Sequence, residues 1–262
     1  MVQAGAGAAG RQGAASVDEA EVAKFAAMAE AWWDPDGKFR PLHRFNPVRL
    51  AYIRDRLCER FARDPKAQRP LEGLRLLDVG CGGGLLSEPL ARLGAAVTGL
   101  DAAAENIRVA ALHAEESGLD IDYRHLSVEE LAAGAARFDA VLNMEVVEHV
   151  ADVGSFLAAS AGLVRPGGMM ILATLNRTPK AFLMAIVGAE YLLRWLPRGT
   201  HDWRRFQRPS ELAAALRRAG LEIEEVTGVA YNPLTDGWRL APRDLDVNYM
   251  MLAVKPDARA GG

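Results

Sequence analysis

The sequence has few cysteines, no long apolar run and no excess of positive charge, and each absence excludes a class of protein. Cys58 and Cys81 are its only two cysteines, which argues against a disulfide scaffold or a cysteine zinc site and fits a reducing compartment. No stretch reaches the ~20 apolar residues of a membrane-spanning helix, and the N-terminus lacks the apolar segment of a secretory signal. We therefore expect a soluble, intracellular protein.

The third absence is a surplus of basic residues. A formal net charge of −3 provides no overall basic field for the phosphates of nucleic acid. The 262 residues suffice for one α/β domain whose core needs no disulfide or metal. Composition predicts a disordered tail at 1–15, a helical lid region at 16–70, the main domain at 71–256 and a second disordered tail at 257–262.

A glycine cluster organises the chain. Leu74 to Val79 has the apolar composition of a short buried strand, and glycines then interrupt it before a run of helix formers. Strand, glycine turn and helix open the nucleotide site of a doubly wound sheet, where ligands lie beyond the carboxyl ends of the strands. Gly80, Gly82 and Gly84 are spaced G-x-G-x-G, whereas a dinucleotide site has G-x-G-x-x-G. The loop thus predicts a nucleotide-type ligand without a clear cradle for pyrophosphate.

An aspartate after the second predicted strand further restricts the class of ligand. The stretch 96–100 predicts a second strand, and Asp101 follows it about 20 residues after the first glycine, where ribose hydroxyls would donate hydrogen bonds to its carboxylate. The alternative is an ordinary glycine-rich turn between strand and helix, but such a turn requires no acid at that distance. Glycine loop and strand-end acid together predict an adenosine-type cofactor, and they resemble the S-adenosylmethionine loop of class I methyltransferases.

The region before the first strand predicts a helix and then a loop. Ser16 and Glu19 have the spacing of a capping box, which predicts a helix over 16–33. A helix in this place most often packs across the cofactor cleft as a lid. Residues 32–49 mix aromatics, prolines and cations without a helical or strand period, so we expect a shaped loop near the ligand.

A second helix is expected over 47–61, and Arg49 stands at its start. Arg49 could clamp the carboxylate of the cofactor's methionine part through paired hydrogen bonds. It could equally be an ordinary surface cation on a helix. Composition alone leaves both possibilities open.

The rest of the chain alternates strands with helices, which predicts an α/β fold with a mostly parallel, seven-stranded sheet and helices on both faces. After the second strand we expect a helix at 103–117, a strand at 121–125, a capped turn at 127–131 where adenine usually rests, a strand at 138–144, a helix at 152–164, a strand at 169–174, a helix at 209–219 and an antiparallel edge pair at 223–229 and 248–254.

The end of the fourth strand carries two acids and an imidazole. If the chain turns helically there, Glu145, Glu148 and His149 fall at i, i+3 and i+4 and share one face. Such a set suits a divalent cation such as Mg²⁺, which would lower the pKa of a bound phenol and make a phenolate nucleophile. Alternatively His149 caps a helix and the acids are solvated or salt-bridged. Both remain open, and His149 and Glu145 are the candidate catalytic residues.

An insert at 176–206 follows the fifth strand. Its middle is apolar but holds Glu190 and Arg194, and cations flank it. This composition suits a helix lying in a membrane surface. A buried lid helix over the substrate would have a similar composition. Both interpretations imply a hydrophobic substrate.

Motifs over nearly all of residues 17–254 resemble those of the ubiquinone biosynthesis O-methyltransferase family. The glycine loop is shared by all class I methyltransferases, whereas the tryptophan pair, the insert and a threonine-histidine-aspartate run are more specific. The resemblance rests on Ala31-Trp32-Trp33-Asp34, Pro41 to Pro47, Leu77 to Gly84, Met144 to His149, Thr174 to Arg177, Pro197 to Asp202 and Val247 to Met250.

The resemblance implies S-adenosylmethionine as cofactor and methylation of the phenol hydroxyls of 2-polyprenyl-6-hydroxyphenol and 3-demethylubiquinol. It implies a Rossmann-like fold and partners that include the polyprenylated substrate, anionic membrane lipid and a ubiquinone biosynthetic complex, with the protein cytoplasmic and peripheral to the inner membrane. The cofactor contacts implied by the resemblance are Arg49, Gly80, Asp101 and Met144, and the implied metal ligands are Glu145, Glu148 and His149. We expect Asp78, Gly82 and Val128 to contact the cofactor as well.

Two other functions use the same motifs. A small-RNA 3′-end 2′-O-methyltransferase also has a Glu-x-x-Glu-His metal run, but the net acidic chain has no clear basic stripe beyond residues 194–208. A non-catalytic scaffold of a membrane-associated biosynthetic complex is the other alternative. A scaffold has no need of an intact glycine loop followed by Asp101, so an enzyme is the leading interpretation.

Overall fold

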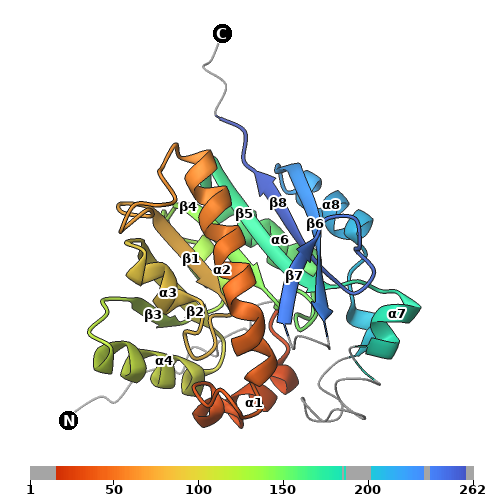
Figure 1. The fold of residues 1–262 in the computed structure, drawn as a ribbon, viewed down its shortest axis with the longest axis horizontal. Helices are drawn as coiled ribbons and strands as arrows, with labels where there is room; N and C mark the ends of the chain where they lie inside the picture. The colour runs from red at the N-terminus through yellow and green to blue at the C-terminus, as the bar shows by residue number, and fades with distance from the viewer. Residues whose placement is uncertain (1–15, 185, 187–201, 233–236, 258–262) are drawn as a thin grey trace, which may run out of the picture.

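The computed structural model describes residues 16–184, 186, 202–232 and 237–257 (Figure 1). Within these residues the chain forms one sheet in the order β3-β2-β1-β4-β5-β8-β6-β7. Strands β1 to β5 pair in parallel, and β8 is antiparallel to both β5 and β6. The strands are β1 (Arg75–Val79), β2 (Ala96–Asp101), β3 (Asp122–His125), β4 (Phe138–Met144), β5 (Val164–Leu175), β6 (Glu222–Asn232), β7 (Gly237–Ala241) and β8 (Asn248–Val254). The expected α/β class is confirmed.

The helices lie between the strands as the alternating pattern predicts. The α-helices are α1 (Glu19–Ala26), α2 (Arg40–Arg60), α3 (Ser87–Arg92), α4 (Ala104–Glu116), α5 (Val128–Ala132), α6 (Val153–Leu163), α7 (Pro179–Ala181) and α8 (Pro209–Arg218), and two 3-10 turns are η1 (Ala29–Ala31) and η3 (Trp203–Arg205). Helices α4, α5, α6 and α8 begin and end within about one residue of the ranges expected from the sequence, whereas α1 and α2 differ from theirs.

The expected count of seven strands is wrong, because the described residues form eight. β6 and β8 do pair antiparallel, but they are not an edge hairpin. β7 pairs with β6 on the outside, and β8 lies between β5 and β6. The strand that the sequence missed is a short edge strand with mostly accessible side chains, so it lacks the apolar pattern by which buried strands are found.

Alternation along the strands gives the sheet two apolar faces. Leu76 packs in the cluster that α2 and α3 cover, whereas the next residue, Leu77, packs in the cluster under α5, α6 and α8. Figure 1 shows α2 crossing the front of the sheet and α6 behind it. Because both faces are covered, β4 and β8 are buried almost throughout, as is typical of the central strands of an α/β sheet.

The N-terminal helix begins later than expected. Asp18, not Ser16, caps α1, since its carboxylate accepts hydrogen bonds from two backbone N–H groups of the first turn. The Ser16 hydroxyl instead donates to Glu129, far away in the sequence. The helix also ends at Ala26, and η1 replaces its expected continuation to residue 33. The capping-box prediction is therefore wrong.

Only the first part of 32–49 is a loop. α2 begins at Arg40 and continues through Pro47. A proline in the first turn, here Pro41, costs nothing because the N–H it lacks would have no partner there. Pro47 removes one hydrogen bond from the helix interior, but α2 buries Ile53 and Leu57 completely against the sheet, and this packing holds the helix together.

Within the described part of the chain, no helix is long and apolar enough to cross a bilayer. Some expectations fall outside those residues. They concern disorder of the tails at 1–15 and 258–262, and the structure of the insert between residues 187 and 201, including Glu190, Arg194 and most of the threonine-histidine-aspartate run.

Candidate functional site

All ten residues that the sequence assigns to the cofactor, a metal or catalysis line one pocket. The pocket has a volume of about 260 Å³ and lies at the carboxyl ends of β1, β2 and β4, the usual ligand site of a doubly wound sheet. The ten are Arg49, Asp78, Gly80, Gly82, Asp101, Val128, Met144, Glu145, Glu148 and His149. The structure brings them together, while the roles assigned to them stay predictions.

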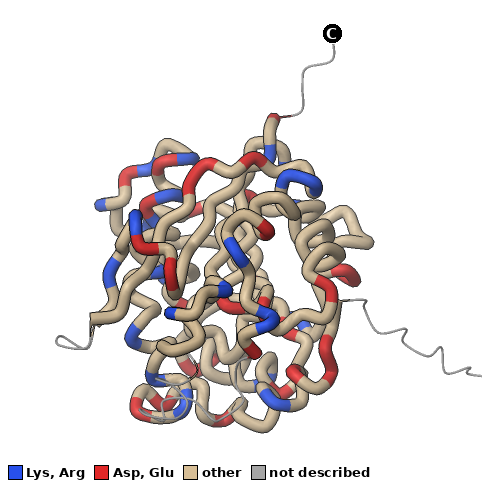
Figure 2. The backbone as a smooth tube through the Cα atoms, turned by 90° about the vertical axis from the view of Figure 1, so that its right-hand side faces the viewer, with Lys and Arg blue, Asp and Glu red and all other residues tan. Residues whose placement is uncertain are grey.

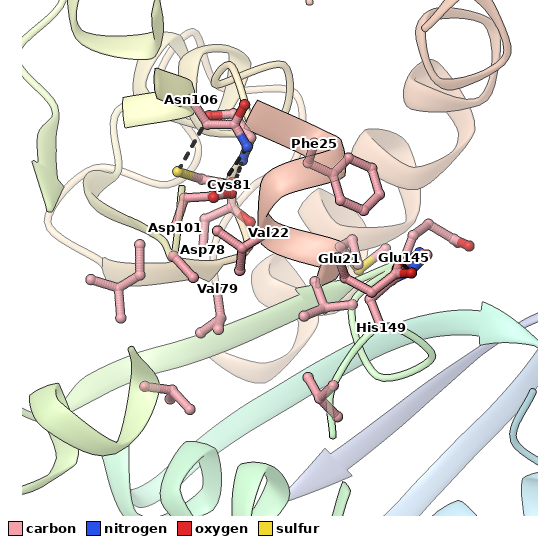
Figure 3. A pocket seen from close by; sticks show the side chains of 18 of the residues that line it. Glu21, Val22, Phe25, Asp78, Val79, Cys81, Asp101, Asn106, Glu145 and His149 are labelled. Carbon is pink, nitrogen blue, oxygen red and sulfur yellow. Dashed lines mark hydrogen bonds and ion pairs between the residues drawn. The ribbon is translucent and has the colours of Figure 1, made fainter. Parts of the chain in front are cut away.

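Figure 3 shows two groups of polar side chains in this pocket. Asp78, Asp101 and Asn106 lie together near Cys81, on the side of the glycine loop. Glu21, Glu145 and His149 lie together on the other side, with the ring of Phe25 above them. Helix α1 carries Val22 between the groups, so the N-terminal helix forms part of the pocket wall.

The glycine loop has the backbone that its composition predicts. Gly80, Gly82 and Gly84 have φ values of 71°, 54° and 89°, a region that residues with a Cβ rarely adopt. A Cβ on Gly82 would also collide with the indole ring of Trp32. The second glycine is thus required by the protein's own tryptophan, a reason that the sequence could not disclose.

Asp101 is held by hydrogen bonds on both carboxylate oxygens. Oδ2 accepts from the backbone N–H of Gly82 at 2.9 Å, and Oδ1 accepts from the N–H of Ala103 at 2.8 Å and from Nδ2 of Asn106 at 3.1 Å. Burial raises the pKa of Asp101, and these three hydrogen bonds oppose the rise. The carboxylate therefore has a fixed orientation at the pocket wall.

Asp78 and Arg49 bring two further ionisable side chains to the pocket. Burial raises the pKa of Asp78 to about 6, against the opposing effects of the Ser87 hydroxyl, which donates at 2.6 Å, and of Arg49. Arg49 is only 4% exposed, which excludes the surface-cation alternative. Burial lowers its pKa, while the nearby charges of Glu145 and Asp78 oppose this.

The expectation that Glu145, Glu148 and His149 share a helical face is wrong. Glu145 has a φ of 59°, in the left-handed region, and the chain continues as an irregular turn rather than a helix. Glu148 is buried, and its Oε2 accepts a hydrogen bond from the Thr174 hydroxyl at 2.7 Å. Burial first, and the charge of Glu145 second, raise the pKa of Glu148 well above its ordinary value. Both effects favour the protonated form of Glu148.

His149 has a partner that sequence reasoning missed. Its Nδ1 lies 2.7 Å from Oε2 of Glu21 on α1, and the ring of Phe25 meets the imidazole edge-on at 5.1 Å between centroids. The hydrogen bond from His149 is the main cause that lowers the pKa of Glu21. No local signal identifies Glu21, because the contact joins residues 128 positions apart.

The donor set does not fit a divalent metal as the side chains lie. Among the residues described, no group of three His, Cys, Asp or Glu side chains is arranged to hold a metal ion. One ring nitrogen of His149 is hydrogen-bonded to Glu21, and the buried carboxyl of Glu148 accepts a hydrogen bond from the Thr174 hydroxyl. Metal ligands must be deprotonated and convergent, so no step of the chemistry is assigned to a metal below.

The methyltransferase domain family matches residues 42–226. A ubiquinone biosynthesis O-methyltransferase from Chelativorans sp. is 60% identical over 245 residues, which cover 94% of this chain and 96% of that protein. The protein of the same name from Brucella ovis is 59% identical over 241 residues, or 92% and 97% of the two chains.

Solved structures of other methyltransferases have the same fold. Magnesium protoporphyrin IX methyltransferase from Synechocystis PCC 6803 with bound SAH superposes with a TM-score of 0.62 at 18% identity, over 91% of this chain and 100% of that one. A SAM-dependent methyltransferase from Aquifex aeolicus gives a TM-score of 0.55 at 12% identity, over 90% and 98% of the two chains. At such identities the likeness concerns the fold alone.

Proposed function

Because this chain belongs to the ubiquinone biosynthesis O-methyltransferase family and is an S-adenosylmethionine-dependent methyltransferase, we propose that it methylates a phenol oxygen of polyprenylated precursors, namely 2-polyprenyl-6-hydroxyphenol and 3-demethylubiquinol. The observation that carries the proposal is the single pocket that joins the glycine loop and Asp101 to the acid-histidine turn after β4. The comparisons give no support to small-RNA methylation or to a non-catalytic scaffold.

The glycine-loop side of the pocket suits the cofactor. Asp101 offers a fixed carboxylate to two ribose hydroxyls, and charge-assisted hydrogen bonds of this kind are the strong ones. Asp78 and Arg49 bring a carboxylate and a guanidinium to the same wall, which is the complement of an amino-acid group with its ammonium and carboxylate. Val128 and Met144 add apolar surface for the rest of the molecule.

The acid-histidine side suits removal of the phenol proton. Methyl transfer is a displacement at the sulfonium methyl, so the phenol oxygen must be positioned in line and deprotonated. Glu21 accepts the Nδ1–H of His149 when the imidazole is in the matching tautomer, which leaves Nε2 to accept the phenol proton. Glu145 lines the same pocket, and a negative charge on its carboxylate would favour the imidazolium that forms.

A divalent metal at Glu145, Glu148 and His149 stays a hypothesis that the side-chain arrangement does not favour. A metal held there would act as a Lewis acid that lowers the pKa of the phenol, whereas in the metal-free scheme His149 removes the phenol proton as a base. The two schemes are separated by a chelator: turnover that survives EDTA supports His149 as the base, and turnover restored only by added Mg²⁺ supports the metal.

We also propose peripheral contact with a membrane, through the segment after α7. Phe182, Leu183 and Met184 expose 44%, 59% and 47% of their surfaces, which argues against the buried-lid alternative for these three. Lys180 and Arg205 form ion pairs with acids of the protein, so the apolar side chains supply most of the attraction. The same contact would bring the enzyme to the cytoplasmic face of the inner membrane and to other enzymes of ubiquinone biosynthesis.

The test is transfer of a labelled methyl group from S-adenosylmethionine to a short-chain demethylubiquinol analogue. We expect a labelled methyl ether, and no label on the 3′ end of a small RNA. Protein that binds the cofactor but methylates no phenol would overturn the proposed function.

A further inference from the structure

A chain of hydrogen bonds connects the N-terminal segment to the acid that faces the ribose. The indole Nε1 of Trp32 donates to Oδ1 of Asn106 at 2.8 Å, and Nδ2 of Asn106 donates to Oδ1 of Asp101 at 3.1 Å. Asn106 is 1% exposed and Trp32 is 8% exposed. All three residues line the pocket, and Figure 3 shows Asn106 directly beside Asp101.

The ring of Trp32 is itself held rigidly. It stacks on Phe39 with 3.8 Å between centroids and an angle of 5° between planes. Its other contacts are with the glycine loop, where a Cβ at Gly82 or Gly83 would collide with it. The neighbouring Trp33 donates its own Nε1–H to the carbonyl of Gly83 at 2.9 Å. Two consecutive indoles thus contact the glycine loop, and only the first reaches Asp101.

The geometry points to Trp32 as a positioning residue for cofactor binding, which acts through Asn106 on the Asp101 carboxylate. This inference rests on the proposed assignment of Asp101 to the ribose hydroxyls. It adds Trp32, 69 positions before Asp101, and Asn106, 5 positions after it, to the residues that determine cofactor affinity.

The physical reason lies in the two ends of the Asn106 amide. Asp101 accepts a hydrogen bond from Asn106 only if the NH₂ end of the amide faces the carboxylate, because the carbonyl end would repel it. The indole N–H of Trp32 can only donate. Its hydrogen bond to Asn106 therefore requires the carbonyl end of the Asn106 amide to face the indole. A buried amide fixed from both sides keeps the carboxylate oriented before the ribose arrives, and such preorganisation raises affinity.

The variant that isolates this effect is Trp32→Phe, which keeps an aromatic ring on Phe39 and the glycine loop but removes the N–H. Loss of one neutral hydrogen bond corresponds to about a 3- to 10-fold rise in Kd. We expect this rise for S-adenosylhomocysteine, measured by calorimetry, and a similar rise in the KM for S-adenosylmethionine with kcat retained. Trp238→Phe is the matched control, because its indole stacks on Phe45, away from Asp101.

Two further measurements distinguish positioning from a general packing defect. Asn106→Ala should raise Kd by a similar factor, and the double variant should cost little more than either single one, since both remove the same chain of bonds. The 2′,3′-dideoxy analogue of S-adenosylhomocysteine should bind wild type and Trp32→Phe equally well, because it has no hydroxyls for Asp101.

The outcomes separate this inference from the proposed function. Equal affinity of wild type and Trp32→Phe for S-adenosylhomocysteine, or a loss that is as large for the dideoxy analogue, overturns the role of Trp32 and leaves the cofactor site standing. Wild type that binds the dideoxy analogue as tightly as S-adenosylhomocysteine overturns the assignment of Asp101 and, with it, this inference.

Discussion

At the scale of single residues, the pocket is defined by buried charges that oppose one another. Arg49 and Asp78 are both almost completely buried, at 4% and 3% exposure. The Ser87 hydroxyl and then Arg49 oppose the rise in the pKa of Asp78, and Glu145 and then Asp78 oppose the fall in the pKa of Arg49. An isolated buried charge would be far more costly than a paired one. Burying both charges costs folding free energy, and such buried ionisable groups are typical of sites that recognise a charged ligand.

We expect cofactor binding to depend on pH through the Asp78 carboxylate. Its pKa is raised by burial to about 6, so the carboxylate is charged at pH 7.5 and mostly neutral at pH 5. When the Asp78 carboxylate is neutralised, its negative charge no longer offsets the positive charge of Arg49, and a cationic cofactor binds less favourably. We expect the affinity for S-adenosylmethionine, measured by calorimetry, to fall as the pH decreases through 6. In Asp78→Asn the affinity should be low at pH 7.5 and change little with pH. Equal wild-type affinities at pH 5 and 7.5 would contradict this.

The raised pKa of Asp78 also makes the free energy of unfolding depend on pH. Between the unfolded value near 3.8 and the folded value of about 6, the folded state binds more protons than the unfolded state. The free energy of unfolding therefore decreases as pH rises through this window. Asp78→Asn removes that slope, which denaturant titrations at pH 4.5 and 6.5 measure directly.

Glu21 connects α1 to His149, the base of the proposed mechanism. Glu21→Gln keeps a hydrogen-bond acceptor for His149 but removes the charge that favours the imidazolium. We expect kcat for the phenol substrate to fall by about 10- to 100-fold, part of the 10²–10⁴ that a general base contributes, with little change in cofactor affinity. Glu19→Gln is the control on the same helix, since Glu19 is exposed. A Glu21→Gln enzyme with wild-type kcat would remove Glu21 from the mechanism.

At the scale of elements, the N-terminal segment joins distant parts of the structure. Ser16 contacts Glu129 in α5, Asp18 pairs with Arg205 in η3, and Glu21 contacts His149 after β4. Figure 2 shows acidic and basic residues interspersed along the backbone rather than gathered by sign. These polar contacts, together with the apolar cluster that joins Met28 and Trp32 to Leu85 and Val109, hold the segment in place.

The proposed membrane contact depends on the segment after α7. Replacing Phe182, Leu183 and Met184 together with Ser removes exposed apolar surface without opening the core. We expect weaker sedimentation with anionic liposomes and unchanged affinity for S-adenosylhomocysteine. Leu112→Ser is the matched control, because Leu112 is 51% exposed on α4. Wild-type protein that stays in the supernatant at low salt would speak against the membrane proposal.

At the scale of the whole molecule, the sheet is the rigid frame of the pocket. Strands β1, β4 and β5 are covered on both faces and bury Leu76, Leu142 and Ile171 completely. The pocket residues at the strand ends are therefore fixed by the core, whereas those of the N-terminal segment are fixed by contacts across the pocket. A ligand that bridges the two parts should stabilise the fold as a whole.

S-adenosylhomocysteine at 100 times its Kd should raise the free energy of unfolding by about 2.7 kcal/mol. For a chain of this size that corresponds to a melting temperature higher by roughly 5–11 °C, measured by scanning calorimetry. Asp101→Ala should melt without this shift at the same ligand concentration. An unchanged melting temperature of wild type at saturating ligand would argue against binding to the native pocket.

The sequence by itself determined the sheet and the positions of the pocket residues on it. Gly80 and Asp101 stand at the ends of strands recognisable from apolar runs, and the carboxyl ends of parallel strands meet at one edge. Local pattern was therefore enough to bring the glycine loop and the β4 turn to one pocket. It was not enough for β7, whose exposed side chains carry no apolar period.

Only the tertiary structure decided which side chains act on these groups. Asn46 and Pro47 continue a helix because α2 packs on the sheet, and Ser16 leaves its capping position for Glu129. Glu145 takes a left-handed backbone that breaks the helical face on which a metal site depended. Glu21 and Trp32 contact His149 and Asn106 across 128 and 74 positions. Periodicity and spacing report neighbours within one element, and contacts between elements follow from how the packed helices cross the strands.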